Sequence, residues 1–403
     1  MKKALLGFFL FIALSSVVAC GSIEGENYKI EFTEEQMKMV EFAREDFEAM
    51  VDILTREFPF FGVAQRREGQ DMNRLFDNFW KELEFSIFYY DITDLERLAG
   101  FFQYVAWGNL AYPLNFLAHL NTRAPEHFFN AEAGDRQRAE DGGRIFETKI
   151  IEYDRIAYIN FSTFLSHYAQ LPDSHVRDEL FEFIYKVKYY EHLILDIRGN
   201  TGGSPRLALD AFIAPNLQKP FSREYLGFFM DTPLFRLHLN HFRLIPNIGF
   251  FIPHHRTHIA EDFVSVNALP YMNQDDLQGF DGVIELSHLI YPNNTNYAFA
   301  GQIWLLVDAQ VFSGAEMFAH SAKITGVMTL VGETTGGSLG GDGYLIASVA
   351  LPNTGVHLTF DMLYITDAYG RALEEFRTVP HHFNRPGMDA LQTVLALIEE
   401  GED

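Results

Sequence analysis

The chain has a single cysteine, Cys20, among its 403 residues. Because a disulfide needs two cysteines, no intrachain bridge can stabilise this fold. Basic residues are also scarce, with 31 Lys and Arg against 55 Asp and Glu and a formal net charge of -24 at pH 7. This charge repels the phosphate backbone of nucleic acids, so we expect no nucleic-acid partner.

Long apolar runs are absent except at the N-terminus, where two lysines precede an apolar stretch from Ala4 to Ala19. A basic start followed by a short apolar run is typical of a signal peptide. The sequence VVAC, which ends at Cys20, resembles a bacterial lipoprotein signal, in which the cysteine becomes the lipidated N-terminus. We therefore expect a signal peptide at 1–20, a tether at 21–32 and a secreted protein anchored to the cell-envelope membrane. The alternative is an ordinary signal peptide with an incidental cysteine.

The chain is 48% hydrophobic, which is enough for a large core, and its length suggests about two to three domains. From about Thr33 to Arg123, apolar residues recur at three- and four-residue spacing, which predicts helices. We expect an all-α N-terminal domain at 33–125, a polar linker at 126–145 and a second domain at 146–403.

The second domain is predicted to be α/β, because buried strands alternate with amphipathic helices along it. Strands are expected at 155–161, 193–197, 303–307 and 328–331, helices at 176–190, 313–323 and 387–400, and a hairpin with strands at 344–351 and 356–365. An aromatic-rich insertion at 207–297 has no clear pattern.

Ser313 is the best candidate for a nucleophile, because it follows a predicted buried strand and begins a predicted helix. The first turn of a helix has free N–H groups and a positive dipole end, which can stabilise an oxyanion beside the serine. Gly314 follows and leaves its own N–H accessible. The alternative is that Ser313 only caps the helix, since serine is a preferred N-cap residue.

A glycine pair, Gly202 and Gly203, follows another predicted strand in LILDIRGNTGG, from Leu193 to Gly203. A turn needs one glycine, so two in succession indicate that another group approaches the backbone closely. The alternative is a turn without a ligand. A phosphate-binding loop is excluded, because the Gly-Lys-Ser/Thr ending is missing. Asp196 and Arg198, which precede the pair, are expected to form an internal ion pair.

Four stretches together resemble the C-terminal-processing, or tail-specific, serine peptidase family. They are LILDIRGNTGG, VFSGAEMFA (311–319), LVGETTGG (330–337) and, more loosely, DAYGRALE (367–374), in the family's order. The resemblance implies a ClpP/crotonase-like α/β core behind an N-terminal helical domain, a peptide or protein substrate and no cofactor. Between His119 and Arg155 there is no room for the PDZ domain that many family members have there, which indicates the branch that resembles tricorn-core and interphotoreceptor retinoid-binding proteins.

The resemblance also implies roles for individual residues. Ser313 would be the nucleophile, and N–H groups of Gly314 and of Gly202 or Gly203 would form the oxyanion hole. The lysine that much of the family uses as base is missing, since Gly337 or Ser338 stands in its place.

In the tricorn-core branch, a histidine of the helical domain and a late glutamate complete the site. The matching histidine is His119, although Leu117 and Ala118 before it depart from the usual pattern. The matching glutamate is Glu374, with Glu375 as the alternative. A histidine can take the serine proton near neutral pH, and a carboxylate can orient it.

Other histidines are expected to be structural. His254 and His258 have the four-residue spacing of a zinc helix, but Pro253 beside them predicts a loop and no metal site. His381 and His382 are expected in the turn after Pro380.

The leading interpretation is an envelope-anchored serine peptidase, whose cleft the 207–297 insertion would cover. A non-catalytic binding protein for an apolar ligand or a peptide, on the same fold, is the alternative. An esterase of another α/β class is disfavoured, because VFSGA lacks the Gly-x-Ser-x-Gly elbow.

Overall fold

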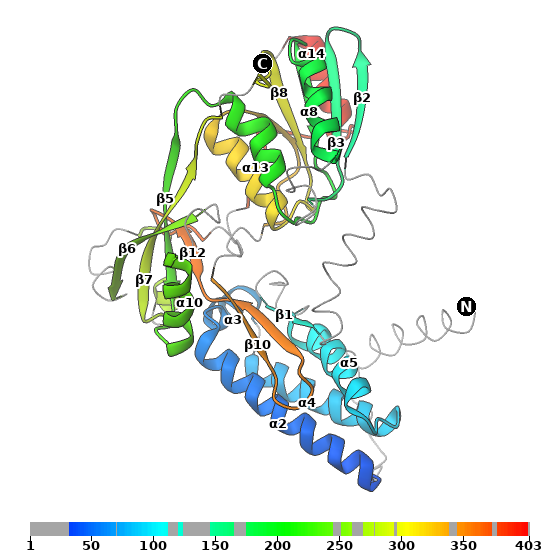
Figure 1. Ribbon diagram of the computed structural model, residues 1–403, viewed down its shortest axis with the longest axis vertical. Coiled ribbons are helices and arrows are strands. Elements are labelled where there is room, and N and C mark those ends of the chain that lie inside the picture. Colours follow the sequence, from blue (N-terminus) through cyan, green and yellow to red (C-terminus); the bar gives the residue numbers. More distant parts are fainter. Residues whose placement is uncertain are drawn as a thin grey trace, which may run out of the picture.

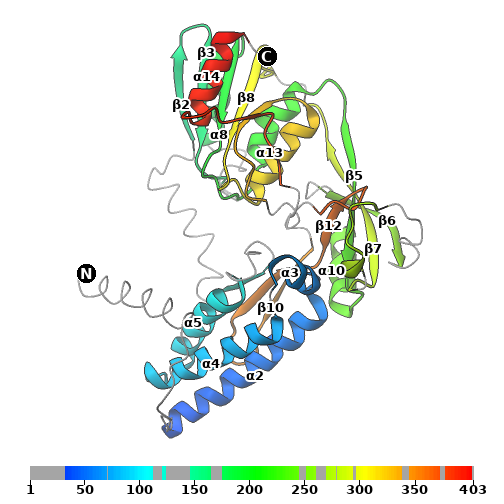
Figure 2. The same ribbon diagram turned by 180° about the vertical axis from the view of Figure 1, so that it is seen from behind.

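The computed structural model describes residues 32–69, 71–111, 120–123, 146–164, 175–244, 251–259, 269–277, 279–293, 296–337, 345–372 and 377–401. The molecule is elongated, with a six-stranded sheet and its helices at one end and a group of helices at the other (Figure 1). A four-stranded sheet lies between them along one side, as the view from behind also shows (Figure 2).

Two of the N-terminal helices begin after residues whose side chains satisfy free backbone N–H groups. Thr33 forms a capping box, because its side chain accepts from the Gln36 N–H while the Gln36 side chain accepts from the Thr33 N–H. The Asp71 carboxylate accepts from the N–H groups of Asn73 and Arg74. The predicted helices are confirmed as α2 (Glu34–Glu57), α3 (Phe61–Glu68), α4 (Met72–Tyr89) and α5 (Leu95–Ala106), followed by the π-helical turn η1 (Trp107–Ala111).

The helical pattern expected to continue to Arg123 gives way to a strand, β1 (Leu120–Arg123). This strand pairs antiparallel with β11 (His357–Asp361), which also pairs with β10 (Ile346–Ala350). Four residues are too few to show the two-residue alternation of a strand, so the pattern could not reveal β1. The pairing of β10 with β11 confirms the predicted hairpin.

The six-stranded sheet has the order β13-β9-β8-β4-β3-β2 among the described residues. Its strands are β2 (Phe146–Glu152), β3 (Ile156–Phe161), β4 (His192–Asp196), β8 (Gln302–Val307), β9 (Thr329–Gly332) and β13 (His382–Phe383). All neighbours are parallel except β2, which is antiparallel to β3. The carboxyl ends of β4, β8 and β9 therefore lie side by side, where α/β sheets place their ligand sites.

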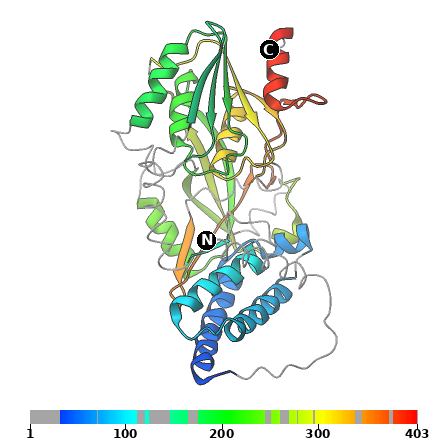
Figure 3. The same cartoon turned by 90° about the vertical axis from the view of Figure 1, so that its right-hand side faces the viewer.

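Successive residues of the central strands face opposite sides of this sheet. Leu193 and Leu195 pack in one hydrophobic cluster with α8 (His175–Val187) and α13 (Gly314–Thr325). Ile194 and Trp304 pack in another with α14 (Ala390–Glu400). Because both faces are covered, the strands are apolar throughout, which is why they could be predicted. Figure 3 shows α14, in red, across the sheet from α8.

The 207–297 insertion forms most of the four-stranded sheet, whose order is β12-β5-β7-β6. Its strands are β5 (Phe221–Phe229), β6 (Phe251–Ile259), β7 (Gly282–Ile290) and, from outside the insertion, β12 (Tyr364–Asp367). The helical segments of this part of the chain are α9 (Arg206–Ala208), η3 (Leu209–Ile213), η4 (Ala214–Asn216), α10 (Pro233–Leu244) and α12 (Gln274–Leu277). The first three pack in the cluster that contains Leu193 and Leu195 of the six-stranded sheet.

Two segments expected to be loop or turn are strands instead. Pro253 to His258 lie in β6, and their register with β7 is irregular between Pro253 and Thr257. Because β6 is an edge strand, a proline there removes no essential ladder hydrogen bond. His382 lies in β13, which pairs with β9, and the Leu330 N–H donates to His381 Nδ1 at 2.8 Å. The chain is thus a helical N-terminal region joined to a mixed α/β core, as predicted.

Candidate active site

Three loops meet at the carboxyl edge of the six-stranded sheet. The first follows β4 and contains the glycine pair, the second follows β8 and leads to Ser313, and the third follows β9 and ends at Gly337. The Phe312 N–H donates to the Asn200 carbonyl at 3.2 Å, and the Ser313 N–H donates to the Gly337 carbonyl at 3.1 Å. The second loop is therefore held between the other two by backbone hydrogen bonds.

Ser313 has an unusual backbone conformation, with φ 55° and ψ −122°. Such a conformation is costly for any residue except glycine, and it persists only where the surroundings impose it. The Ser313 side chain makes no capping hydrogen bond to α13. The structure therefore gives no support to the interpretation of Ser313 as a helix cap, and the partly buried hydroxyl is left for another role.

Gly202 lies directly against the start of α13. A Cβ atom placed on Gly202 would be 2.8 Å from the Phe312 carbonyl oxygen, 2.9 Å from Ser313 Cβ and 3.0 Å from the Gly314 nitrogen. A Cβ on Gly314 would be 1.8 Å from the Gly203 carbonyl oxygen. The backbone of the glycine pair therefore contacts the loop that leads to Ser313, and this is the close approach that two adjacent glycines predicted.

Asn200 distinguishes the two glycines of the pair. Its side chain is fully buried and donates from Nδ2 to the Phe161 carbonyl at 3.1 Å, while its Oδ1 accepts from the Gly202 N–H at 2.9 Å. The Gly202 N–H is thus already used. Within the described residues, neither the Gly203 N–H nor the Gly314 N–H has a hydrogen-bond acceptor. The first belongs to the glycine pair that packs against the start of α13, and the second belongs to the residue after Ser313.

Glu316, which the sequence analysis did not single out, lies buried beneath this site on the first turn of α13. Its Oε1 accepts from the Thr378 N–H at 3.0 Å and from the Thr378 hydroxyl at 2.6 Å, and its Oε2 accepts from the Gly337 N–H at 3.3 Å. Burial raises the pKa of the Glu316 carboxyl, although these donors act against the rise. The signal in the sequence that could have revealed Glu316 is its position three residues after the candidate serine.

Gly337, one of the two residues expected in place of the family lysine, contributes backbone groups only. Its carbonyl binds Ser313 and its N–H binds Glu316. Burial lowers the pKa of Lys323, whose Nζ donates to the Val379 carbonyl at 2.5 Å. Lys323 is on α13, ten residues beyond Ser313, which corresponds to about 15 Å along a helix, so it cannot replace the missing base.

The remaining predicted site residues, Cys20, His119, Ser338, Glu374 and Glu375, lie outside the described residues. Within the described part of the chain, no group of His, Cys, Asp and Glu side chains could hold a metal ion. Among the same residues, no helix combines the length and apolar character needed to cross a bilayer.

Comparisons with known proteins agree with this geometry. Residues 249–381 match the family described as peptidase family S41. The fold is similar to that of mature CPAF, with 12% sequence identity, a TM-score of 0.52 and coverage of 91% of this chain and 97% of that one.

A proposed peptidase from Parabacteroides merdae ATCC 43184 also has this fold, with 17% identity, a TM-score of 0.50 and coverage of 88% and 96% of the two chains. No curated protein matches the chain. The match over residues 249–381 and the shared fold make the chain similar to peptidase family S41, the C-terminal-processing serine peptidases.

Proposed function

We propose that this chain hydrolyses peptide bonds through an acyl-enzyme on Ser313. The observation that carries the proposal is the unusual backbone of Ser313, which is packed against the glycine pair. Among the described residues, the N–H groups of Gly203 and of the adjacent Gly314 have no acceptor. Such donors can bind the oxyanion of a tetrahedral intermediate. Asn200 favours Gly203 over Gly202 as the first donor.

In the proposed mechanism, Ser313 Oγ attacks the peptide carbonyl carbon while His119 accepts the hydroxyl proton. Glu374, or Glu375 beside it, would orient His119 and stabilise its cation. The protonated histidine then gives its proton to the leaving amine, and the C–N bond breaks. A water molecule, deprotonated by the same histidine, hydrolyses the ester and regenerates Ser313. These assignments for His119 and Glu374 rest on the family resemblance.

We further propose that Cys20 carries the lipid that anchors the mature protein to the outer face of a cell membrane. The support is the sequence VVAC after a short apolar run. Lipidation with more than one acyl chain is strong enough to anchor a protein stably. We also propose that the chain belongs to the branch without a PDZ domain and that residues 207–297 cover the cleft. Both proposals rest on the sequence alone.

The decisive experiment is labelling of the purified chain with a fluorophosphonate probe. Wild type, Ser313→Ala and His119→Ala are compared, with circular dichroism to verify folding. We expect labelling to be lost in both variants. Loss in Ser313→Ala alone keeps the hydrolase and rejects His119 as the base, whereas labelling that persists in Ser313→Ala rejects the mechanism.

A second candidate is a binding protein for an apolar ligand or peptide on the same fold. The observation in its favour is Gly337, which leaves the site without the family's usual lysine. A folded wild-type chain that resists the probe and copurifies with lipid would support this candidate.

A further inference from the structure

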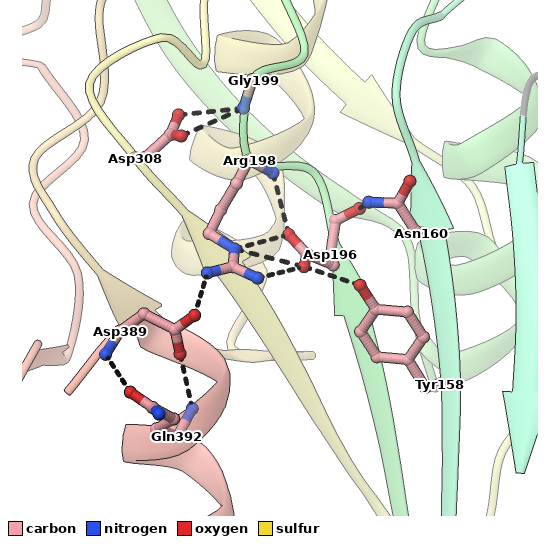
Figure 4. A network of polar contacts seen from close by, with 8 residues as sticks. All are labelled: Tyr158, Asn160, Asp196, Arg198, Gly199, Asp308, Asp389 and Gln392. Atoms are coloured by element: carbon pink, nitrogen blue, oxygen red, sulfur yellow. Dashed lines mark hydrogen bonds and ion pairs between the residues drawn. The ribbon is translucent and has the colours of Figure 1, made fainter. Parts of the chain in front are cut away.

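The residues just before the glycine pair form a charged network at the end of β4. The Arg198 guanidinium forms an ion pair with the Asp196 carboxylate at 2.7 Å, which confirms the pair expected from the sequence. The same carboxylate accepts from the Arg198 N–H at 3.0 Å and from the Tyr158 hydroxyl at 2.8 Å. Asp196 is almost completely buried, so these donors replace the water that would otherwise solvate its carboxylate (Figure 4).

Arg198 also reaches a second carboxylate, on the helix that covers the other face of the sheet. Its Nη1 lies 3.2 Å from Asp389 Oδ2. Asp389 is the N-cap of α14, where its Oδ1 accepts from the Gln392 N–H at 2.8 Å while the Gln392 side chain accepts from the Asp389 N–H. Figure 4 shows Arg198 between Asp196 and Asp389, so this one side chain joins the loop after β4 to α14.

Asp308 holds the same loop from its other side. Both of its carboxylate oxygens lie 3.1 Å from the Gly199 nitrogen, and its Oδ1 also accepts from the Gln310 N–H at 3.0 Å. Gln310 belongs to the loop that leads to Ser313. Asp308 therefore holds the loop after β4, which contains the glycine pair, against the loop after β8, which leads to Ser313.

These contacts leave little freedom to the chain between Arg198 and Gly203. Arg198 and Gly199 are fixed through their side chain and backbone, and Asn200 binds both Phe161 and the Gly202 N–H. An oxyanion donor is effective only when it is held in place before the reaction, and a misplacement of about 1 Å can cost about 100-fold in rate.

We propose that Arg198 is a positioning residue for the oxyanion hole, and that through Asp389 the docking of α14 sets the position of the Gly203 N–H. The inference rests on the proposed function, because it assumes that the Gly203 N–H binds the oxyanion. Arg198 does not touch the substrate; it acts through the loop that it holds.

The test uses the full-length chain and a fluorophosphonate probe, whose phosphonyl oxygen occupies the oxyanion hole. The first-order labelling rate and the half-saturating probe concentration are measured for wild type and Arg198→Lys. Lysine keeps the charge beside Asp196 but cannot form the planar, two-sided contact of arginine. We expect the labelling rate to fall about tenfold with an unchanged half-saturating concentration, because only the transition state uses the donor.

Arg385→Lys is the matched control. Arg385 also contacts α14, because its guanidinium lies 2.6 Å from Glu400 and its N–H donates to the Thr393 hydroxyl at 3.0 Å. Its variant is expected to label at the wild-type rate. An equal fall in both variants would assign the effect to α14 stability and overturn the inference.

Asp389→Asn provides a second variant that does not endanger folding, since Asp389 is exposed and asparagine is an equally good N-cap. We expect a labelling rate about threefold below wild type at low salt, since an exposed ion pair contributes only a small free energy. The difference should vanish near 1 M salt, where the screening length is about 3 Å. A purely structural effect would not depend on salt in this way.

The outcomes separate this inference from the proposed function. Absence of Ser313-dependent labelling in the wild-type chain overturns both. Normal labelling of wild type, with unchanged rates in Arg198→Lys and Asp389→Asn, overturns the inference alone.

Discussion

Gly202 and Ser313 approach so closely that a methyl group on the glycine would lie 2.9 Å from the serine Cβ. The two residues come from loops after different strands, β4 and β8, and they meet because those strands are parallel neighbours. Ser313, the proposed nucleophile, and the proposed oxyanion loop are therefore one packed unit. A change in either backbone must displace the other.

The first prediction concerns Gly202→Ala. Gly202 has φ 111°, which an alanine adopts only with strain, and the added methyl group would collide with the Phe312 carbonyl. We expect fluorophosphonate labelling to fall by about 100-fold, as for other displacements of a catalytic group. Gly326→Ala is the control, since Gly326 has φ 69° but no atom near its missing Cβ. If the two variants label equally, the close packing of Gly202 has no catalytic importance.

The second prediction concerns the strain at Ser313. Both Ser313→Ala and Ser313→Gly remove the hydroxyl, but only glycine can adopt the positive φ of 55° without strain. We expect the free energy of unfolding to be about 1 kcal/mol higher for Ser313→Gly than for Ser313→Ala. Urea unfolding of the two variants measures the difference. A glycine variant less stable than the alanine variant would show that the serine conformation carries no strain.

The third prediction concerns Glu316. Its removal leaves the buried hydroxyl of Thr378 and the N–H of Gly337 without their acceptor, while the Thr378 N–H keeps the Thr335 hydroxyl at 2.9 Å. Because an unsatisfied buried donor costs about 1–3 kcal/mol, we expect Glu316→Ala to lower the free energy of unfolding by about 3 kcal/mol or more. Glu316→Gln keeps one acceptor oxygen and should lie between wild type and Glu316→Ala. A cost below about 1 kcal/mol for the alanine variant would contradict this role.

The fourth prediction concerns the pH dependence of stability. Burial, with a smaller effect of Arg223, lowers the pKa of His288 to about 4. Burial lowers the pKa of His320 to about 3, with smaller effects of Arg223, His288 and Lys323, and its Nε2 lies 2.9 Å from the Tyr225 hydroxyl. Both folded-state pKa values lie below the value of about 6.5 in an unfolded chain. The unfolded state therefore binds protons first, and stability falls as the pH drops below 6.5.

This loss is measured by urea unfolding at pH 6.5 and at pH 5. Each buried histidine should contribute about 2 kcal/mol to the difference between these two pH values. His320→Gln, which can keep the contact with Tyr225, should reduce the difference by that amount. A variant with the same pH dependence as wild type would show that His320 is protonated in the folded chain.

The fold could be predicted wherever the sequence pattern is long or strongly apolar. The buried strand at 193–197 and the helix at 313–323 were found within a few residues of β4 and α13. The strands β1 and β6 were missed for physical reasons. Leu120–Arg123 is too short to show a period, and β6 tolerates Pro253 because it is an edge strand.

The candidate site was predicted only in part. Ser313 and the glycine pair could be recognised in the sequence by their residue types and by their positions after predicted strands. The structure brings them together. The difference between Gly202 and Gly203 could not be predicted, because it depends on where the Asn200 side chain turns. The buried position of Glu316 beside Thr378 joins residues far apart in the sequence, which a local pattern does not contain.

The attachment of the β10–β11 hairpin to the helical region has a consequence for how the chain is made. Asp46 of α2 is fully buried and accepts from the N–H groups of Asn353 and Thr354, and β1 pairs with β11. A chain synthesised from its N-terminus exposes Asp46 and the apolar faces of the helices long before the hairpin exists. The helical region therefore gains its contacts with the hairpin only after nearly the whole chain has emerged, and Asp46 has no Asn353 or Thr354 to accept from until then.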